Sequence, residues 1–175
     1  MGSPKLPGKY VREGELKSMP GLVEYTPRAR YSFSAGQALS TFLEGLKEGR
    51  ILGKKCPSCG RVLVPPRVYC EFCFTPTGEW VEVPGTGRVE TAVVSYIGTM
   101  RERLEKPIVI GVVRLDAPGY REDSFDYAGL IHRLCGVTED DVKSGRVIGM
   151  RVKPRWRKDR EGSILDIECF EPEGV

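Results

Sequence analysis

"CPSCGRVLVPPRVYCEFC", residues 56–73, places four cysteines within one short segment of the chain. They form two Cys-x-x-Cys pairs, which are Cys56 with Cys59 and Cys70 with Cys73. Two such pairs supply four thiolates, the ligand set of a closed, tetrahedral metal site. Such a site accepts zinc or iron, and zinc is the expected ion because it is the usual one in structural sites. The segment therefore predicts a rubredoxin-like zinc ribbon that holds one structural zinc ion per chain.

The residues between the two cysteine pairs, "RVLVPPRVY" (61–69), are expected to form a short hairpin that bends at Pro65 and Pro66. A segment of about twenty residues has too little apolar area to order itself, so we expect the metal to hold it in place. The four-thiolate site leaves no open position at which a water molecule would be activated. We therefore expect a structural clip with a core of its own, so that metal removal unfolds the ribbon and largely spares the rest.

The composition is that of a globular protein, with 40% hydrophobic and 29% charged residues among 175 and a net charge of +3. The chain has no run of about eighteen apolar residues and no apolar segment of a secretory signal near its start. These features predict a soluble cytoplasmic protein without a membrane partner. In that compartment we interpret Cys135 and Cys169 as two buried small side chains, and a disulfide is the alternative that their spacing does not decide.

Residues 1–33 are rich in proline, glycine and charge, and they are predicted to be an extended N-terminal arm. Residues 34–79 are predicted to contain a helix followed by the zinc ribbon. Ser34 is the expected N-cap of this helix, and Gly49 is expected to end it in a left-handed conformation. The helix has one apolar stripe, which consists of Ala38, Leu39, Phe42, Leu43 and Leu46.

Residues 80–175 are predicted to be an OB-fold. From Trp80 onward, β-branched and aromatic runs alternate with turn residues, and "TEDDVKSG" (138–145) is typical of a short helix. The runs expected to form strands are "EWVEVPGTGRVETAVVSYI" (79–97), "PIVIGVVRLD" (107–116), "SFDYAGLIHRL" (124–134), "RVIGMRVKPRW" (146–156) and "SILDIECFEP" (163–172). Three strands, a short helix and two strands are the order of a five-stranded Greek-key barrel with a helix between strands 3 and 4. The predicted fold class is therefore mainly β, with an N-terminal helix, a zinc ribbon and an OB-fold barrel.

One strand of the predicted barrel carries a row of positive charge. Its alternation places a set of cations on one face, which consists of Arg151, Lys153, Arg155 and Arg157. An ordinary solvated face is the commoner explanation, and a surface for the phosphates of nucleic acid or of coenzyme A is the sharper one. A stacking platform for bases would come from Trp80, Tyr96, Phe125 and Tyr127. A single-stranded nucleic-acid-binding protein is therefore the alternative function.

The sequence contains one histidine, His132, three residues before Cys135. On a helix this spacing would bring the imidazole near the thiol, but the segment is predicted to be a strand end, where these positions face opposite sides. Motifs of nucleophile elbows, phosphate loops and dinucleotide sites are absent from the sequence. The chain is therefore predicted not to be an enzyme in its own right.

A longer stretch carries a family resemblance. "FLEGLKEGRILGKKCPSCGRVLVPPRVYCEFC" (42–73), followed by Trp80 and the late "VIGMRVKPRW" (147–156), resembles the acyl-CoA-associated family of rubredoxin-like zinc ribbons with an OB-fold. That family was first catalogued as domain of unknown function 35. The resemblance covers about residues 31–171. It implies a non-catalytic scaffold subunit, which in archaea joins acetoacetyl-CoA thiolase to hydroxymethylglutaryl-CoA synthase in the mevalonate pathway and helps retain the CoA-linked intermediate.

The resemblance also implies partners and a ligand. The expected partners are thiolase-like or hydroxymethylglutaryl-CoA synthase-like enzymes, and the expected ligand is CoA or acyl-CoA, bound where the helix and ribbon meet the barrel. The candidates for contact with its phosphates are Arg50, Lys54, Lys55 and Arg67. Phe42 and Leu46 are the candidates for lining a path for the pantetheine chain, with ordinary solvated cations and core residues as the alternative for all six. The N-terminal arm is a candidate strap for binding a partner.

Overall fold

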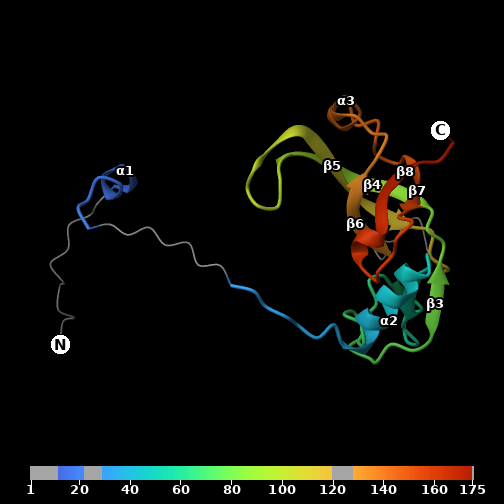
Figure 1. Cartoon of the computed structure of the whole chain (residues 1–175). Helices are drawn as coiled ribbons and strands as arrows, with labels where there is room; N and C mark the ends of the chain where they lie inside the picture. Colours follow the sequence, from blue (N-terminus) through green and yellow to red (C-terminus); the bar gives the residue numbers. More distant parts are fainter. Residues whose placement is uncertain (1–11, 22–28, 120–127, 175) are drawn as a thin grey trace, which may run out of the picture. The chain divides into compact units, whose positions relative to one another are not determined.

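The computed structural model describes residues 12–21, 29–119 and 128–174, and it divides the chain into two units, Met1–Ser34 and Ala35–Val175. In the first unit, α1 (Glu13–Leu16) forms a single helical turn within the predicted extended arm (Figure 1). The backbone N–H of Arg12 donates to the Glu15 carboxylate at 3.2 Å, which satisfies one of the free donors at the start of this turn. Farther along the first unit, Tyr31 and Phe33 are both exposed.

The second unit begins with α2 (Gly36–Lys47), which buries the predicted apolar stripe through Ala38, Phe42 and Leu46. The prediction of Ser34 as N-cap is wrong, because Ala35 occupies that position and makes no side-chain cap bond. The left-handed conformation of Gly49 just after the helix is confirmed, with a φ of +79°. The helix lies close to the strand that follows it: a Cβ atom on Gly45 would meet the Leu52 side chain at 2.9 Å. Gly45 therefore permits a close packing that no larger residue would allow.

The ribbon contains a three-stranded antiparallel sheet in the order β2-β1-β3. Its strands are β1 (Ile51–Lys55), β2 (Val62–Leu63) and β3 (Trp80–Val83). The predicted hairpin within residues 61–69 is wrong, because β2 pairs with β1 across the first cysteine pair and Tyr69 bridges to Pro76. The two halves of the predicted hairpin do not pair with each other, because Val62 and Leu63 pair with β1 whereas Tyr69 pairs with Pro76.

The predicted run 79–97 is divided between two sheets. Its first part is β3, which pairs with β1 of the ribbon, and its second part is the first strand of the barrel. Glycines let the chain pass close to other strands between the two sheets. A Cβ atom on Gly85 would lie 2.6 Å from Pro154, and one on Gly87 would lie 2.1 Å from the Arg114 carbonyl oxygen. The ribbon sheet therefore includes Trp80–Val83, which was predicted to belong to the OB-fold.

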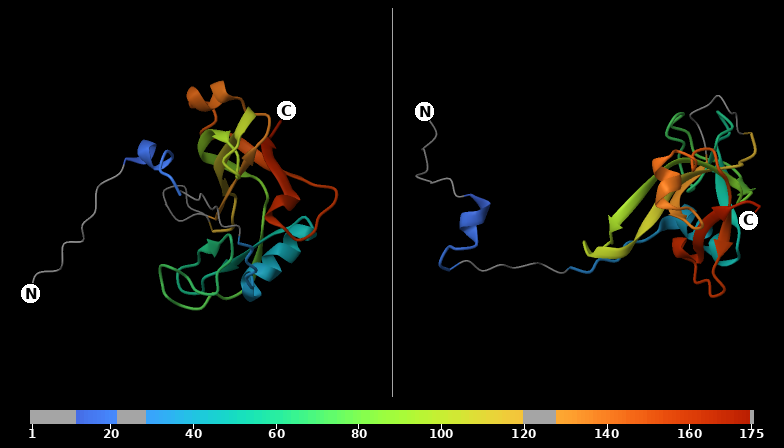
Figure 2. Two further views of the ribbon diagram at one scale, coloured as in Figure 1. Left: turned by 60° about the vertical axis from the view of Figure 1, so that its left-hand side comes forward. Right: turned by 90° about the horizontal axis from the view of Figure 1, so that it is seen from above.

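The remaining strands form a closed barrel in the order β4-β5-β6-β8-β7, with β7 paired back to β4. They are β4 (Gly87–Ile97), β5 (Arg103–Leu115), β6 (Gly129–Leu134), β7 (Arg151–Trp156) and β8 (Ile167–Pro172). Figure 2 shows the ribbon diagram from two further sides. The helix α3 (Glu139–Lys143) lies between the third and fourth barrel strands, so the predicted OB-fold is confirmed. Thr138 caps this helix, since its hydroxyl accepts the Asp141 N–H at 3.2 Å.

The helix, the ribbon and the barrel share one hydrophobic core, so the expectation of separate cores is wrong. Phe42 and Leu46 of α2 and Ile51 of β1 belong to the same buried cluster as the barrel strands. The barrel contributes buried side chains from every strand, among them Val89, Val113, Leu130, Val152 and Phe170. The ribbon has only a small cluster of its own beside the metal site, formed by Cys56, Leu63 and Cys70. The three elements therefore pack as one body.

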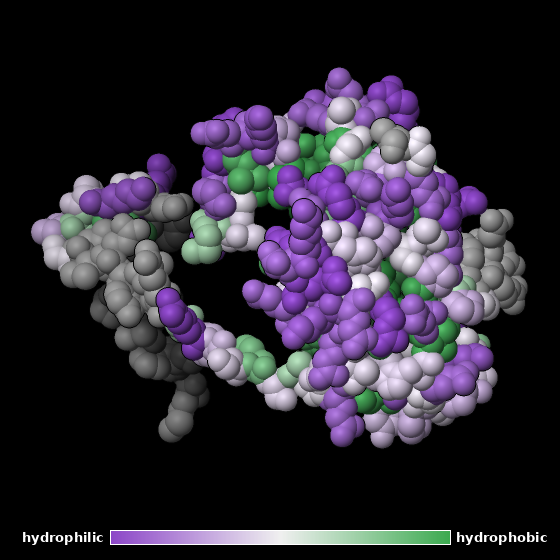
Figure 3. Space-filling view, turned by 45° about the vertical axis from the view of Figure 1, so that its right-hand side comes forward, coloured by the Kyte–Doolittle hydropathy of each residue, from purple (hydrophilic) through white to green (hydrophobic). Residues whose placement is uncertain are grey.

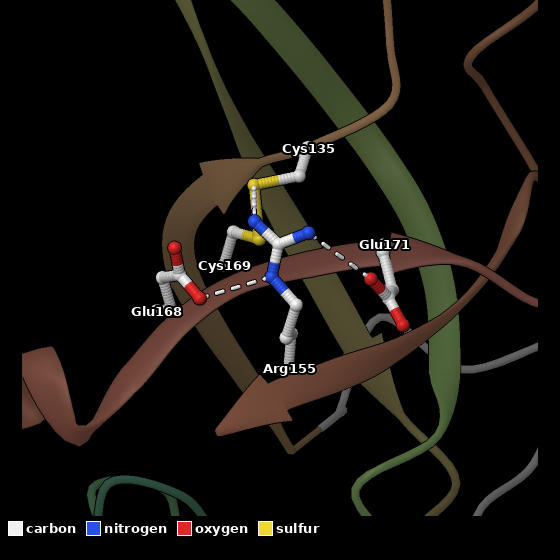
Figure 4. Close-up of a disulfide and its surroundings, with 5 residues drawn as sticks. All are labelled: Cys135, Arg155, Glu168, Cys169 and Glu171. Atoms are coloured by element: carbon white, nitrogen blue, oxygen red, sulfur yellow. Dashed lines mark hydrogen bonds and ion pairs between the residues drawn. A yellow bond between two sulfur atoms is a disulfide. The ribbon is translucent and has the colours of Figure 1, made fainter. Parts of the chain in front are cut away.

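Cys135 and Cys169 form a disulfide, with their Cα atoms 5.8 Å apart, so their main interpretation as free buried side chains is wrong (Figure 4). The bond lies at the seam where β6 and β8 meet in parallel and Leu134 pairs with Phe170. The backbone N–H of Cys135 also donates to the Phe170 carbonyl at 2.8 Å. The disulfide therefore closes the barrel beside a short ladder.

Among the described residues, no helix has the length and apolar character needed to cross a membrane.

Candidate functional site

The four predicted metal ligands converge in the ribbon. The Sγ atoms of Cys56, Cys59, Cys70 and Cys73 all lie within 4.8 Å of one another, and those of Cys59 and Cys70 are 3.8 Å apart. Two thiolates bound tetrahedrally to zinc at about 2.3 Å stand roughly 3.8 Å apart. Cys56 and Cys70 are fully buried, whereas Cys59 is exposed. The donor set and its spacing fit one structural zinc ion, as predicted.

The two Cys-x-x-Cys knuckles have the same backbone structure. The N–H groups of Gly60 and Phe74 each donate at 2.9 Å to the carbonyl of the cysteine four residues earlier. Each of these two residues has a positive φ, +74° for Gly60 and +52° for Phe74. Glycine adopts this conformation without strain, whereas phenylalanine adopts it rarely. The two knuckles therefore share one turn. Its last position is occupied by glycine in the first knuckle and by phenylalanine in the second.

The thiols of the cluster differ in their affinity for protons. The Cys59 backbone N–H, which donates to Cys56, is the main cause that lowers the pKa of the Cys56 thiol to about 6. A hydrogen bond with Ser58 lowers the pKa of Cys73, but the neighbouring Cys59 thiol and burial outweigh it and raise that pKa to about 11. Like charges that converge on one point disfavour the last deprotonation. A bound cation removes this conflict, because it stabilises all four thiolates together.

The second knuckle exposes large apolar side chains that sequence reasoning missed. Val68, Tyr69, Phe72 and Phe74 are all exposed, and the Arg61 guanidinium lies 3.9 Å from the centroid of the Phe72 ring. The signal available in the sequence was the density of aromatic residues in "VYCEFCF" (68–74), in a clip that has no room to bury them. We name this set of four side chains the knuckle patch.

The residues predicted to contact CoA are not gathered at one place. Phe42 and Leu46 are 1% and 0% exposed, so their side chains offer no surface along which a ligand would lie. Arg50 is exposed and forms ion pairs with Glu48 and Glu82. It lines a cavity of about 410 Å³ at the junction of β1, β3 and β7, together with Thr86, Pro154 and Trp156 among others.

The other three predicted cations each have a neighbour of their own. The Lys54 ammonium lies 5.2 Å from the centroid of the Trp80 ring, and Lys55 pairs with Glu79 at 3.3 Å. Arg67 pairs with Glu71, and both line a smaller cavity of about 260 Å³ between the ribbon and strands β5 and β6. Arg50 and Arg67 therefore line two different cavities.

Three cations of the basic row, Arg151, Lys153 and Arg155, form ion pairs with carboxylates. Arg151 donates two hydrogen bonds to Asp116, at 2.8 and 2.7 Å, and a third to Glu173 at 3.1 Å. The side-chain hydrogen bond from Arg151 is the main cause that lowers the pKa of Asp116 below its ordinary value. Arg155 pairs in the same way with Glu168 at 3.0 Å (Figure 4). This arrangement favours an ordinary ion-paired face over a phosphate-binding one. Figure 3 shows one side of the molecule, on which hydrophilic side chains predominate.

The aromatic residues proposed as a base-stacking platform are divided between elements. Trp80 belongs to the ribbon sheet, whereas Tyr96 lies on β4 and donates its hydroxyl to Glu139. Phe125 and Tyr127 lie outside the described residues. The alternative function in nucleic-acid binding therefore gains no support from these positions.

His132 and Cys135 are both engaged in the fold. The imidazole is 7% exposed, its Nε2 donates to the Ile164 carbonyl at 3.1 Å, and its ring packs edge-on against Phe170. The sulfur of Cys135 is bonded to Cys169. A cysteine nucleophile needs a free thiol, and the sulfur of Cys135 is not free.

The comparison with known protein families agrees with this arrangement. Residues 43–77 match the rubredoxin-like zinc ribbon domain of ChsH2, and residues 80–157 match its C-terminal OB-fold domain. The chain therefore contains a rubredoxin-like zinc ribbon of the ChsH2 type, followed by an OB-fold of the ChsH2 type. The two matched segments, in this order, span most of the second structural unit.

Proteins similar to this chain include two curated proteins and one solved structure. The chain is 28% identical over 115 residues to a probable enoyl-CoA hydratase alpha subunit of Thermomonospora curvata. The match covers 66% of this chain and 32% of that subunit. The chain therefore spans about a third of the length of that relative. It is 26% identical over 112 residues to a DUF35 domain-containing scaffold protein of Methanocaldococcus jannaschii, covering 63% of this chain and 70% of the relative.

The solved structure is that of a DUF35-family protein of unknown function from Sulfolobus solfataricus. It is 28% identical, with a TM-score of 0.50, and the match covers 68% of this chain and 78% of that one. The resemblance to the family of domain of unknown function 35, which was predicted from the sequence, is confirmed by these matches.

Proposed function

We propose that this protein is a non-catalytic scaffold subunit that associates with a thiolase-like or hydroxymethylglutaryl-CoA synthase-like enzyme and helps retain its CoA-linked intermediate. The observation that carries the proposal is the state of the residues on which thiolase-type chemistry depends. All six cysteines are engaged, four in the metal cluster and two in the disulfide, and the one histidine is buried. The reactive cysteine and its base would then belong to the partner enzyme.

The relatives support the same class of function. One is described as a subunit of a probable enoyl-CoA hydratase and another as a scaffold protein. Both descriptions fit a chain that acts beside an enzyme of acyl-CoA metabolism. The rigid packing of helix, ribbon and barrel around one core is what a scaffold requires, because a preorganised surface loses little entropy on binding.

For the CoA ligand, we propose the cavity lined by Arg50 and Trp156 as the site on this chain. The guanidinium suits a phosphate, and the half-buried indole offers a flat apolar wall for an adenine ring. Arg50 is shared between Glu48 and Glu82, so a phosphate must displace a carboxylate before it binds. Binding by the isolated chain would therefore be weak, and a partner would complete the site. Lys54, Lys55 and Arg67 remain candidates for outlying phosphate contacts.

Calorimetry on the full chain tests this proposal. Titration with CoA, with acetyl-CoA and with a short single-stranded oligonucleotide compares the two candidate ligands directly. We expect CoA to bind and Arg50→Ala to weaken it by roughly tenfold, the loss of one charge-assisted contact, while Lys106→Ala on the β4–β5 hairpin leaves it unchanged. Binding of the oligonucleotide alone, with a steep salt dependence, would contradict the proposal.

A further inference from the structure

The knuckle patch is a concentrated apolar surface on the ribbon. Its members are all more than half exposed: Val68 is 54%, Tyr69 59%, Phe72 55% and Phe74 83% exposed. They come from seven consecutive residues around the metal ligands Cys70 and Cys73. Together they expose on the order of 500 Å² of side chain, and patches of this size on a single protein often bind a partner.

Phe74 contributes little to the fold that would explain its presence. Its position matches that of Gly60 in the first knuckle, where the same hydrogen bond and a positive φ are met by glycine. A phenylalanine at a φ of +52° is strained, and its side chain is 83% exposed and buries little in return. Strain at an exposed position points to a role outside the fold.

The charges beside the patch favour a protein partner over nucleic acid. Arg67 pairs with Glu71, Lys55 pairs with Glu79, and the Arg61 guanidinium lies over the Phe72 ring. The described cations here are therefore matched by carboxylates or by a ring. Nucleic-acid binding depends on positive charge that is free to replace counterions. A neutral apolar surface is instead complementary to an apolar surface of another protein.

The area of the patch excludes a second copy of this chain as the main occupant. A stable interface buries about 800 Å² on each partner, so two such patches pressed together would bury too little. A partner with a concave apolar pocket would cover the knuckle and its rim as well. Aromatic residues that project into such pockets dominate the affinity of protein interfaces.

We infer that the knuckle patch docks into an apolar pocket of the acyl-CoA enzyme, with Phe74 as the central side chain. This inference rests on the proposed function, because it assigns the surface through which the scaffold holds its enzyme. The metal has a second role in this account, since it holds the knuckle in the shape that presents the ring. Metal-free protein should therefore lose its partner.

Affinity capture with the full tagged chain tests the inference. The chain is incubated with an extract of the organism that encodes it, and captured enzymes are identified and quantified by mass spectrometry. We expect Phe72→Ser with Phe74→Gly, and Phe74→Gly alone, to reduce recovery of the acyl-CoA enzyme at least tenfold. The matched control is Ile97→Ser with Met100→Ser, two exposed apolar residues of the β4–β5 hairpin, and it should capture as much as the unchanged chain. Zinc content and melting temperature show that each variant is folded.

The possible results separate the two proposals. If both knuckle variants retain zinc and capture the enzyme at the unchanged level, the inference is overturned and the scaffold function stands. If the unchanged chain captures no acyl-CoA enzyme, both are overturned. A photoreactive phenylalanine analogue at position 74 should crosslink to the captured enzyme, whereas the same analogue at position 100 should not. Crosslinking from position 74 only to a second copy of this chain would also overturn the inference.

Discussion

Arg160 donates from its Nε to the carbonyl oxygen of Lys47 at 2.8 Å, and thereby joins the β7–β8 connection of the barrel to the last turn of α2. The two residues are 113 positions apart in the chain. A cation at this end of a helix satisfies a free carbonyl and complements the helix dipole. This hydrogen bond therefore connects the helix to the barrel, in addition to the apolar core that the helix, ribbon and barrel share.

Arg160→Ala is expected to lower the free energy of unfolding by about 0.5–1.5 kcal/mol, the usual contribution of one such hydrogen bond. Urea unfolding monitored by tryptophan fluorescence measures the change. Lys158→Ala, an exposed cation in the same connection, is the control and should have little effect. If the Arg160→Ala chain is as stable as the unchanged one, the hydrogen bond from Arg160 to Lys47 does not contribute to stability.

Removal of the metal should destabilise the whole second unit. Ile51, Val62 and Val83 of the ribbon strands are buried in the same cluster as the barrel strands, so loosening the ribbon exposes part of the barrel core. We expect a chelator to lower the midpoint of a single thermal transition by roughly 10 °C or more, as each kcal/mol corresponds to about 2–4 °C in a chain of this size. A separate barrel transition at the original temperature would contradict the shared core.

Reduction of the disulfide should destabilise the barrel at the seam of β6 and β8. The link between Cys135 and Cys169 spans 34 positions, and a loop of this length typically contributes about 2–4 kcal/mol. The melting temperature should therefore fall when a dithiol reductant is added. The double variant Cys135→Ala with Cys169→Ala should already melt at the lower temperature and should not respond to the reductant. Equal melting temperatures for the oxidised and reduced chain would contradict this role.

Asp141 gives the stability a dependence on acid pH. The Thr138 hydroxyl, the Thr138 backbone N–H and Arg146 all donate to its carboxylate and lower its pKa from 3.8 to about 2. Because the folded-state pKa is lower than the unfolded one, the stabilisation is present above pH 4 and is lost as the pH falls toward 2. Asp141→Asn should therefore be less stable at neutral pH and should show a flatter stability curve between pH 4 and 2. Parallel curves for the two chains would contradict the assignment.

The metal ligands and the barrel could be predicted because their signals are local. The spacing of Cys56, Cys59, Cys70 and Cys73 determines the donor set, and the order of strands with a helix at 138–145 is typical of an OB-fold. The hairpin predicted within residues 61–69 was wrong because both of its halves pair with residues outside this segment.

Other features depend on which distant segments meet. Lys153 of β7 is paired with a carboxylate because the antiparallel register places it opposite Glu171, which no local pattern reveals. The disulfide needs two Cα atoms brought to 5.8 Å by barrel closure, and the burial of Phe42 and Leu46 needs the barrel beneath the helix. The pairing of β3 with β1 likewise joins residues about thirty positions apart, so the run 79–97 looked continuous.

Thioester turnover by the purified chain tests most directly whether it is a scaffold without chemistry of its own. Release of free CoA from acetyl-CoA and acetoacetyl-CoA is measured for the isolated zinc-loaded chain and for the complex captured from its organism. The account predicts no release above background by the isolated chain and turnover by the complex. Turnover by the isolated chain at the rate of the complex would contradict it.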